Sequence, residues 1–300
     1  MKNNLCCPLC LSTQSKLKWK SSSKEISEIN TIYNCTTKVR NRPAVYECSK
    51  CNHQFTDFLQ KQREIISEYE ELVDIDYLKL ETVKTKTFKL AFDRLFPFLD
   101  GESKLLEVGS YLGFFLEIAN KNGIRTTGVE PSKWAVEKCR QRNLNVIQGD
   151  FTKVASSITK EFDVVVSWDV IEHVFDPIEF FALLSSKVKN GGVVAISTLD
   201  RSNFLPRLLR SKWPWIIPMH LHYFDRQSVI KLGENAGCQL IASGSHIHFA
   251  NLEYVISKFP LINKLISSSN LRTWLRNIIL PFSFGDVRYF IFRKNNDYDL

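Results

Sequence analysis

The sequence has little of what marks membrane, secreted or fibrous proteins. No apolar run approaches the ~18 residues of a membrane-spanning helix, and no apolar stretch follows residues 1–5, so we expect neither a spanning helix nor a signal peptide. Glycine (12) and proline (10) show no period, which excludes collagen-like and low-complexity chains. These absences predict a cytoplasmic protein, whose eight cysteines stay reduced and need an explanation other than disulfides.

The composition that remains is that of a globular protein with a basic excess at both ends. Of the 300 residues, 44% are apolar and 24% are charged, which is enough for one large domain with an appendage. Residues 1–64 carry +6 and residues 201–300 carry +7, so a net charge of +8 leaves −5 for the middle (8 − 6 − 7). The basic ends are either solvated surface or a binding face for an anionic partner.

Two C-x-x-C pairs stand near the start of the chain. Cys7 and Cys10 form one pair, and Cys48 and Cys51 form the other. Two such turns complete a tetrahedral shell of four thiolates, which suits a structural zinc ion with no open position. Alternating stretches at 31–35 and 44–47 predict hairpin strands between the pairs. Residues 1–60 are therefore predicted to form a zinc ribbon, with Cys6 and His53 as alternative ligands.

The rest of the chain predicts a connector and an α/β domain. Apolar residues recur at threes and fours over 61–100, which predicts a helical connector. From residue 101 to 300 short β-rich runs alternate with helical ones, which predicts a doubly wound, mostly parallel sheet. The expected strands cover 105–108, 126–129, 145–147, 162–167 and 193–197. The expected helices cover 113–122, 132–142, 151–159 and 176–189.

Polar residues and glycines follow the expected strands in order. Gly109 and Gly113 follow the first strand and let the chain turn closely into a helix. Glu130 ends the second strand about 20 residues later, where a carboxylate can bind both hydroxyls of a ribose. After the third strand, Asp150 can accept from an adenine amino group and Phe151 can stack on or flank the base. This order predicts a nucleoside site at the strand ends.

Together with residues 167–174 after the fourth strand, these strand ends resemble the class I S-adenosylmethionine (SAM)-dependent methyltransferases over 75 to about 245. The run Asp-Val-Ile-Glu-His-Val at 169–174, followed by Asp176 and Pro177, is similar to the small-molecule branch that includes the ubiquinone-pathway O-methyltransferases. The ribbon in front looks like methyltransferases of bacterial sugar and polysaccharide pathways. The resemblance implies a Rossmann-like seven-stranded sheet, with strands at 238–241 and 289–292 and the last one antiparallel. The implied cofactor-binding residues are Glu107, Gly109, Tyr111, Gly113, Glu130, Asp150, Phe151 and Trp168.

One position departs from the family pattern. Tyr111 stands where the middle glycine of acid-x-Gly-x-Gly-x-Gly belongs. An outward ring leaves SAM binding intact, whereas an inward ring weakens it. A nicotinamide dehydrogenase is the competing interpretation, but the spacing of Gly109 and Gly113 suits a pyrophosphate poorly.

The catalytic candidates follow the fourth and fifth strands. Glu172, His173 and His220 are predicted catalytic residues, with His222 as a further candidate base. The resemblance adds a divalent ion at Asp169, Glu172 and His173, which would lower the pKa of an acceptor hydroxyl. The alternative is that Glu172 and His173 only anchor the next loop.

Two long segments are expected to be helical caps over the acceptor pocket, at about 200–224 and 252–284. Their tryptophans and basic residues suit a sugar or phosphate-bearing acceptor, or a peripheral contact with the inner face of a membrane. The predicted activity is methyl transfer to a hydroxyl of a small molecule or of a sugar or glycan, including a lipid-linked one. The rivals are an RNA methyltransferase and a non-catalytic scaffold. Nucleic acid is the less expected partner, because the ribbon lacks aromatics interleaved with basic residues.

Overall fold

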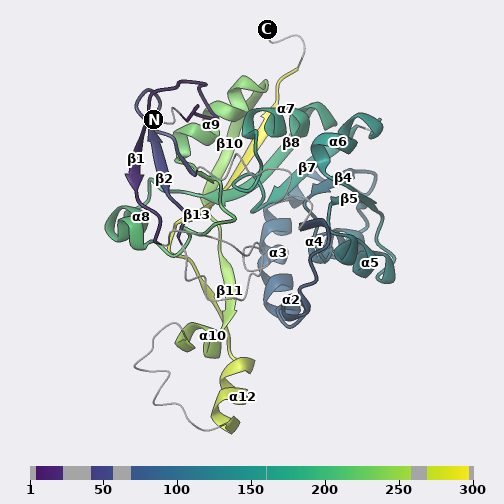
Figure 1. Cartoon of the computed structure of the whole chain (residues 1–300). Helices are drawn as coiled ribbons and strands as arrows, with labels where there is room; N and C mark the ends of the chain where they lie inside the picture. Colours follow the sequence, from purple (N-terminus) through teal and green to yellow (C-terminus); the bar gives the residue numbers. More distant parts are fainter. Residues whose placement is uncertain (1–4, 23–41, 57–68, 160, 258–268, 297–300) are drawn as a thin grey trace.

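The computed structural model describes residues 5–22, 42–56, 69–159, 161–257 and 269–296 (Figure 1). The strands are β1 (Ser15–Trp19), β2 (Val45–Cys48), β3 (Gln54–Thr56), β4 (Lys104–Val108), β5 (Arg125–Glu130), β6 (Val146–Gln148), β7 (Phe162–Trp168), β8 (Val188–Leu199), β9 (His222–Tyr223), β10 (Cys238–Ser245), β11 (His248–Asn251), β12 (Ile279–Phe282) and β13 (Val287–Lys294). The α-helices are α2 (Ile75–Leu78), α3 (Glu81–Leu95), α4 (Phe114–Lys121), α5 (Lys133–Gln141), α6 (Phe151–Val154), α7 (Pro177–Lys187), α8 (Phe204–Leu209), α9 (Arg226–Asn235), α10 (Leu252–Ser257) and α12 (Ser269–Asn277).

The central sheet has the strand order β10-β13-β8-β7-β4-β5-β6. β4 pairs in parallel with β5 on one side and with β7 on the other, so the winding direction reverses beside β4. β13 runs antiparallel to both β8 and β10. The expected seven-stranded, mostly parallel sheet is confirmed. In such sheets ligands bind at the carboxyl ends of the strands, next to the reversal.

Each face of the sheet has its own hydrophobic core, because successive side chains of a strand point to opposite faces. Leu106 and Val165 belong to a core with residues of α6, α7 and α9, whereas Leu105 and Val164 belong to a core with residues of α3, α4 and α5. Figure 1 shows these two groups of helices on either side of the sheet. Each buried aliphatic side chain of this kind contributes about 1.5–3 kcal/mol. The two cores therefore fix where the strand ends lie.

The N-terminal segment forms a second sheet that takes its last strand from the α/β domain. Its order is β1-β2-β3-β9, and β3 pairs antiparallel with β9, which lies in the 200–224 insertion. The Arg201 guanidinium also donates to the carbonyl of Asn52 (2.7 Å). The expected strand at 44–47 corresponds to β2, and the one at 31–35, with Cys35, lies outside the described residues. The ribbon is thus joined to the insertion by backbone hydrogen bonds.

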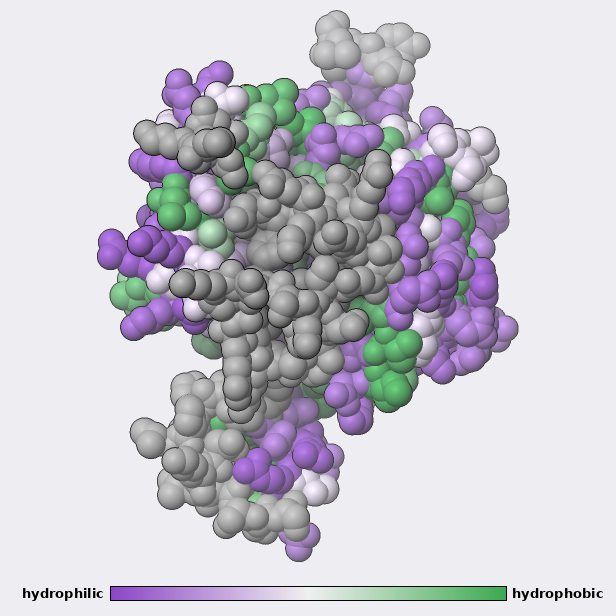
Figure 2. All heavy atoms as spheres, viewed as in Figure 1, coloured by the Kyte–Doolittle hydropathy of each residue, from purple (hydrophilic) through white to green (hydrophobic). Residues whose placement is uncertain are grey.

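The second insertion forms a unit that projects from the body of the molecule. β11 and β12 pair antiparallel, and α10 and α12 lie at the far end of this hairpin (Figures 1 and 2). The Phe249 N–H donates to Oγ1 of Thr87 on α3 (3.0 Å), which ties the base of the unit to the body. Among the described residues, no helix is both long and apolar enough to cross a bilayer.

Candidate active site and metal-ligand clusters

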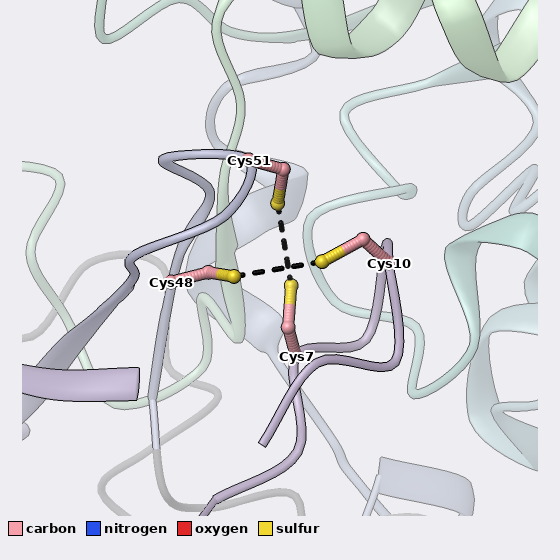
Figure 3. A group of neighbouring side chains, drawn as sticks. All are labelled: Cys7, Cys10, Cys48 and Cys51. Carbon is pink, nitrogen blue, oxygen red and sulfur yellow. Dashed lines mark hydrogen bonds between the residues drawn. The ribbon is translucent and has the colours of Figure 1, made fainter. Parts of the chain in front are cut away.

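Four thiols of the ribbon converge on one point (Figure 3). The sulfurs of Cys7, Cys10, Cys48 and Cys51 lie within 4.8 Å of one another, and two of the pairs are 3.5 Å apart. Four ligands around a zinc ion with bonds of ~2.3 Å stand about 3.8 Å apart, so the spacing fits. Cys7 and Cys48 are buried. The cluster is compatible with the predicted structural zinc site.

The structure distinguishes the alternative ligands. Cys6 is exposed and outside the thiol cluster. His53 is fully buried, and its Nε2 lies 3.2 Å from Nδ1 of His222 instead of near the sulfurs. His222 in turn holds the carbonyl of Val174 through Nε2 (2.8 Å). His53 and His222 therefore link the ribbon to the loop after β7.

The loop after β4 depends on two glycines. Gly109 has φ +79°, and a Cβ there would lie 2.5 Å from Cγ2 of Val170. Gly113 has φ +72°, and its Cβ would lie 2.3 Å from Cδ1 of Leu144. Side chains are excluded at both positions by conformation and by space. The loop thus packs closely against Val170, which follows β7, and Leu144, which precedes β6.

Glu130 lies at the end of β5 and is fully buried. Its carboxylate accepts the N–H of Tyr111 (2.9 Å) and the N–H of Ser132 (2.8 Å). Burial raises the pKa of Glu130 to about 7, although these two N–H groups and the Tyr69 phenol, which also hydrogen-bonds to the carboxylate, act to lower it. Glu130 and the glycine loop are therefore brought together as predicted. Tyr69 is a contact that the sequence did not indicate.

The ring of Tyr111 lies in an aromatic cluster between α2 and α5. It meets Tyr77 edge-on, with ring centroids 4.7 Å apart, and lies 6.2 Å from Trp134. The residue has φ +43°, an uncommon conformation outside glycine. The backbone N–H of Tyr111 donates to the Glu130 carboxylate, while its ring packs on Tyr77 and Trp134.

Asp150 and Phe151, the other two predicted nucleoside contacts, both interact with residues of the protein itself. Asp150 is the N-cap of α6, and its Oδ1 accepts the N–H of Thr152 (3.0 Å). Phe151 is 5% exposed and packs edge-on against Phe180 in the core of one sheet face. Its ring is thus part of that core, which leaves little of it for stacking on a base.

A buried cluster follows β7 and takes one member from the 200–224 insertion. One ligand atom each from Glu172, His173 and His220 lies within 4.8 Å of the others. His173 Nδ1 lies 2.8 Å from the carbonyl of Met219, and His220 Nδ1 lies 2.7 Å from the carbonyl of Trp215. A carbonyl oxygen only accepts, so each Nδ1 carries the proton and each Nε2 keeps its lone pair. The predicted catalytic residues are brought together.

Burial sets the protonation of this cluster. It raises the pKa of Glu172 to about 8, with Asp169 adding to the shift, and Glu172 accepts a hydrogen bond from Oγ1 of Thr198 (2.9 Å). Burial lowers the pKa of His220 to about 3 and also lowers that of His173, which a carbonyl partly offsets. At neutral pH the cluster therefore holds a protonated carboxyl beside two neutral imidazoles.

The structure divides the residues of the predicted divalent-ion site. Glu172 and His173 group with His220, whereas Asp169 groups with His246 and His248. The three residues fall into two groups because Asp169 directly follows β7, whereas Glu172 and His173 lie beyond the turn that follows this strand. The two histidines, which lie at the junction of β10 and β11, were not predicted from the sequence, although their His-x-His spacing is a pattern that metal ligands can have.

The sequence of this chain is similar to those of known methyltransferases. Residues 82–243 match the family model described as a methyltransferase domain. The chain is 30% identical over 227 residues to the ubiquinone biosynthesis O-methyltransferase of Vibrio vulnificus (strain YJ016), covering 71% of this chain and 92% of the relative. The chain belongs to the class I SAM-dependent methyltransferases.

Solved structures of methyltransferases share the fold. A SAM-dependent methyltransferase from Archaeoglobus fulgidus superposes with a TM-score of 0.51 at 19% identity, over 74% of this chain and all (100%) of the other. The magnesium protoporphyrin IX methyltransferase of Synechocystis PCC 6803 with bound SAH superposes with a TM-score of 0.50 at 11% identity, over 79% and 96%.

The strand ends of this methyltransferase carry polar atoms that suit SAM. Among the described residues, Glu107 Oε2, Ser110 Oγ and Trp168 Nε1 are buried without a hydrogen-bond partner, and all three residues stand at the ends of β4 and β7. Burial and the neighbouring Glu130 raise the pKa of Glu107 well above its usual value. An ammonium or hydroxyl of a bound ligand would satisfy such atoms. The residues present therefore fit the cofactor.

Proposed function

We propose that this methyltransferase acts on a hydroxyl oxygen of a small-molecule acceptor. SAM, when bound, supplies a methyl group on a sulfonium. The proposal rests chiefly on the buried cluster of Glu172, His173 and His220, which lies on the same sheet edge as Glu130. A hydroxyl that gains a methyl group must lose its proton, and neutral imidazoles are suited to accept it.

Within the cluster we assign His173 as the base that accepts the proton of the acceptor hydroxyl. Its Nε2 keeps a lone pair because Nδ1 donates to Met219. The pKa of His220 is about 3, which makes that ring a weak base. His220 then positions the acceptor, and Glu172, protonated at neutral pH, is a hydrogen-bond donor beside it.

We further propose that the acceptor hydroxyl belongs to a sugar, free or lipid-linked. The insertion that carries His220 also holds Trp213 and Trp215, whose indole N–H groups both donate to Oδ2 of Asp286 (2.9 and 3.0 Å). Trp213 is buried (2% exposed), so only the Trp215 indole, held in place this way, offers a face to a sugar ring. Trp215 is the more exposed of the two (37%).

An acceptor panel tests the proposal. The full chain is incubated with SAM and, in turn, a catechol, a nucleoside diphosphate sugar, a polyprenyl-phosphate sugar and an RNA oligonucleotide, and S-adenosylhomocysteine and product mass are measured. We expect turnover with a hydroxyl acceptor, highest with a sugar. We expect His173→Gln to lower kcat at least ~100-fold with little change in the KM for SAM, and His220→Gln to affect kcat less.

Two results would contradict the proposal. Methylation of an RNA base would favour the nucleic-acid rival. An unchanged product yield in His173→Gln, on a hydroxyl acceptor that the wild type methylates, would remove the proton-accepting role. Turnover with the catechol alone would keep O-methylation and exclude the sugar.

A further inference from the structure

A second set of nitrogen and oxygen ligands lies next to the catalytic cluster. Asp169 directly follows β7, His246 directly follows β10, and His248 begins β11. One ligand atom from each lies within 4.8 Å of the other two. Asp169 is 77 and 79 positions before the two histidines (246 − 169 and 248 − 169), so the tertiary structure alone brings it to them.

Two ring nitrogens of the group lack hydrogen-bond partners within the described part of the chain. Among the described residues, Nδ1 of His246 and Nε2 of His248 are buried without a hydrogen-bond partner. A buried ring nitrogen left without a partner costs free energy, and a metal ion is one ligand that satisfies several such atoms at once. The cluster of Glu172, His173 and His220 differs, because hydrogen bonds to carbonyls already occupy one nitrogen of each ring.

Neighbouring residues hold the three side chains in place. Oδ1 of Asp169 accepts from Oγ of Ser197 (2.6 Å), which in turn accepts the N–H of Asp169 (3.0 Å). The ring of His246 stacks on Trp168 at 27° and 6.0 Å, and His248 packs on Phe282. Such outer contacts orient metal ligands in known sites. Asp169 also has φ +54°, a strained conformation that occurs often at functional sites.

We propose that Asp169, His246 and His248 bind a divalent first-row transition metal ion. Two imidazole nitrogens and one carboxylate suit Fe²⁺, Zn²⁺, Mn²⁺ or Co²⁺ better than Mg²⁺ or Ca²⁺. Three protein ligands leave open positions for water or for an acceptor oxygen. Bonds of about 2.1 Å place such ligands about 3.0–3.4 Å apart, so small side-chain movements close the site.

The ion has a use in the proposed reaction. It would lie beside the residues after β7 that include Glu172 and His173, where it can bind the acceptor hydroxyl and lower its pKa. This role rests on the proposed function. Ion binding itself does not, and the test below measures binding without turnover.

Cobalt titration distinguishes this site from the thiol cluster. The full chain, stripped of metal by chelation, is titrated with Co²⁺ while absorbance and bound metal are followed. Cobalt bound by four thiolates gives sulfur charge-transfer bands, whereas cobalt bound by two histidines and a carboxylate does not. We expect two ions per chain, one of each kind.

Matched variants assign the second ion. We expect His248→Gln and Asp169→Asn to weaken its binding at least tenfold and to leave the thiolate bands unchanged. His173→Gln removes a ligand of the neighbouring cluster and is expected to keep both ions. His248 is only partly buried, so His248→Gln is the variant expected to fold normally. Unchanged thiolate bands and an unchanged melting temperature show in the same sample that a variant has folded.

The proposal is overturned if wild-type chain binds cobalt through thiolates alone. It is also overturned if folded His248→Gln retains the second ion, or if His173→Gln loses it while His248→Gln does not. The last of these results would place the ion in the cluster of Glu172, His173 and His220. Because no methyl acceptor is present, failure of the proposed function leaves these outcomes unaffected.

Discussion

Single buried carboxyl groups determine much of the chemistry of this methyltransferase. Glu130 and Glu172 are both almost fully buried, yet their surroundings differ. Glu130 accepts two backbone N–H groups, whereas Glu172 accepts a hydroxyl and lies near Asp169. Backbone donors favour the charged form and a neighbouring carboxylate opposes it. The two groups are therefore suited to different tasks, hydroxyl binding and proton-linked chemistry.

Glu130→Gln tests the ribose contact. Loss of hydrogen bonds to a charged group costs about 1.5–3 kcal/mol, so we expect SAM to bind about 10–100-fold more weakly in calorimetry. Because the pKa of Glu130 is about 7, wild-type affinity should also fall as the pH is lowered from 8 to 6, and the variant should lack this dependence.

Glu102→Gln is the matched control, since Glu102 is exposed and pairs with Arg125 on the surface. It should bind SAM like the wild type. Wild-type affinity in Glu130→Gln would show that the carboxylate does not bind the cofactor.

Glu172→Gln is expected to change how stability depends on pH. Folded Glu172 keeps its proton up to about pH 8, whereas the unfolded chain loses it near 4.5. Between these values the folded state binds more protons, so the free energy of unfolding falls as the pH rises. Glutamine removes this fall. The variant should gain on the order of 4 kcal/mol over the wild type between pH 5 and 8.5, measured by denaturant unfolding, and an unchanged difference would contradict the assignment.

At the scale of elements, the ribbon and the first insertion behave as one unit. β3 is held by the thiol cluster at one end and pairs with β9 at its edge. Only Leu221 separates His220 from β9, so the ribbon supports the segment that carries this catalytic candidate. A structural metal adds folding free energy directly. The metal site is thus expected to stabilise the active site at a distance.

Chelation should therefore unfold the ribbon and loosen β9. We expect hydrogen exchange to speed up at least tenfold in β2, β3 and β9 when zinc is removed, while β4 and β5 stay protected. Cys48→Ser should give the same pattern, and Cys6→Ser, which changes an exposed thiol outside the cluster, should not. Equal protection of β9 with and without metal would mean that the ribbon does not support it.

At the scale of the whole molecule, the unit of β11, α10, α12 and β12 projects from the body and contributes no strand to the central sheet. Its α12 exposes Leu271 (42%) and Trp274 (59%), and Phe284 after β12 is 64% exposed. Arg276 lies on the same helix with a side chain that is 61% exposed. Exposed aromatic and basic residues on a short helix are typical of a peripheral membrane contact. We therefore retain the expectation of a membrane surface as partner.

Vesicle sedimentation tests this contact. The full chain should bind vesicles that contain anionic lipid, and Trp274→Ser should reduce binding roughly tenfold, as expected for one indole withdrawn from the bilayer. Phe96→Ser, which alters an exposed aromatic on the body of the molecule (54%), is the control and should bind normally. Equal sedimentation of both variants would exclude α12 as the contact.

The sequence by itself determined that the candidate site residues follow successive strands and that four cysteines form two C-x-x-C pairs. Gly109 and Glu130 were identified because a parallel sheet places successive strand ends on one edge, and the cysteine pairs because a tight turn points two sulfurs at one ion. These are local rules, and each involves residues close in sequence or in regular alternation.

Only the tertiary structure decided which side chains meet across the loops. Asp169 turns toward His246 and His248 because β10 and β7 lie in one sheet, whereas Glu172 and His173 meet His220 because the insertion folds back along β3. Phe151 lies in the core for the same reason, since α6 packs on α7. Such contacts depend on packing between distant segments, and no pattern within one segment records which neighbour a side chain will find.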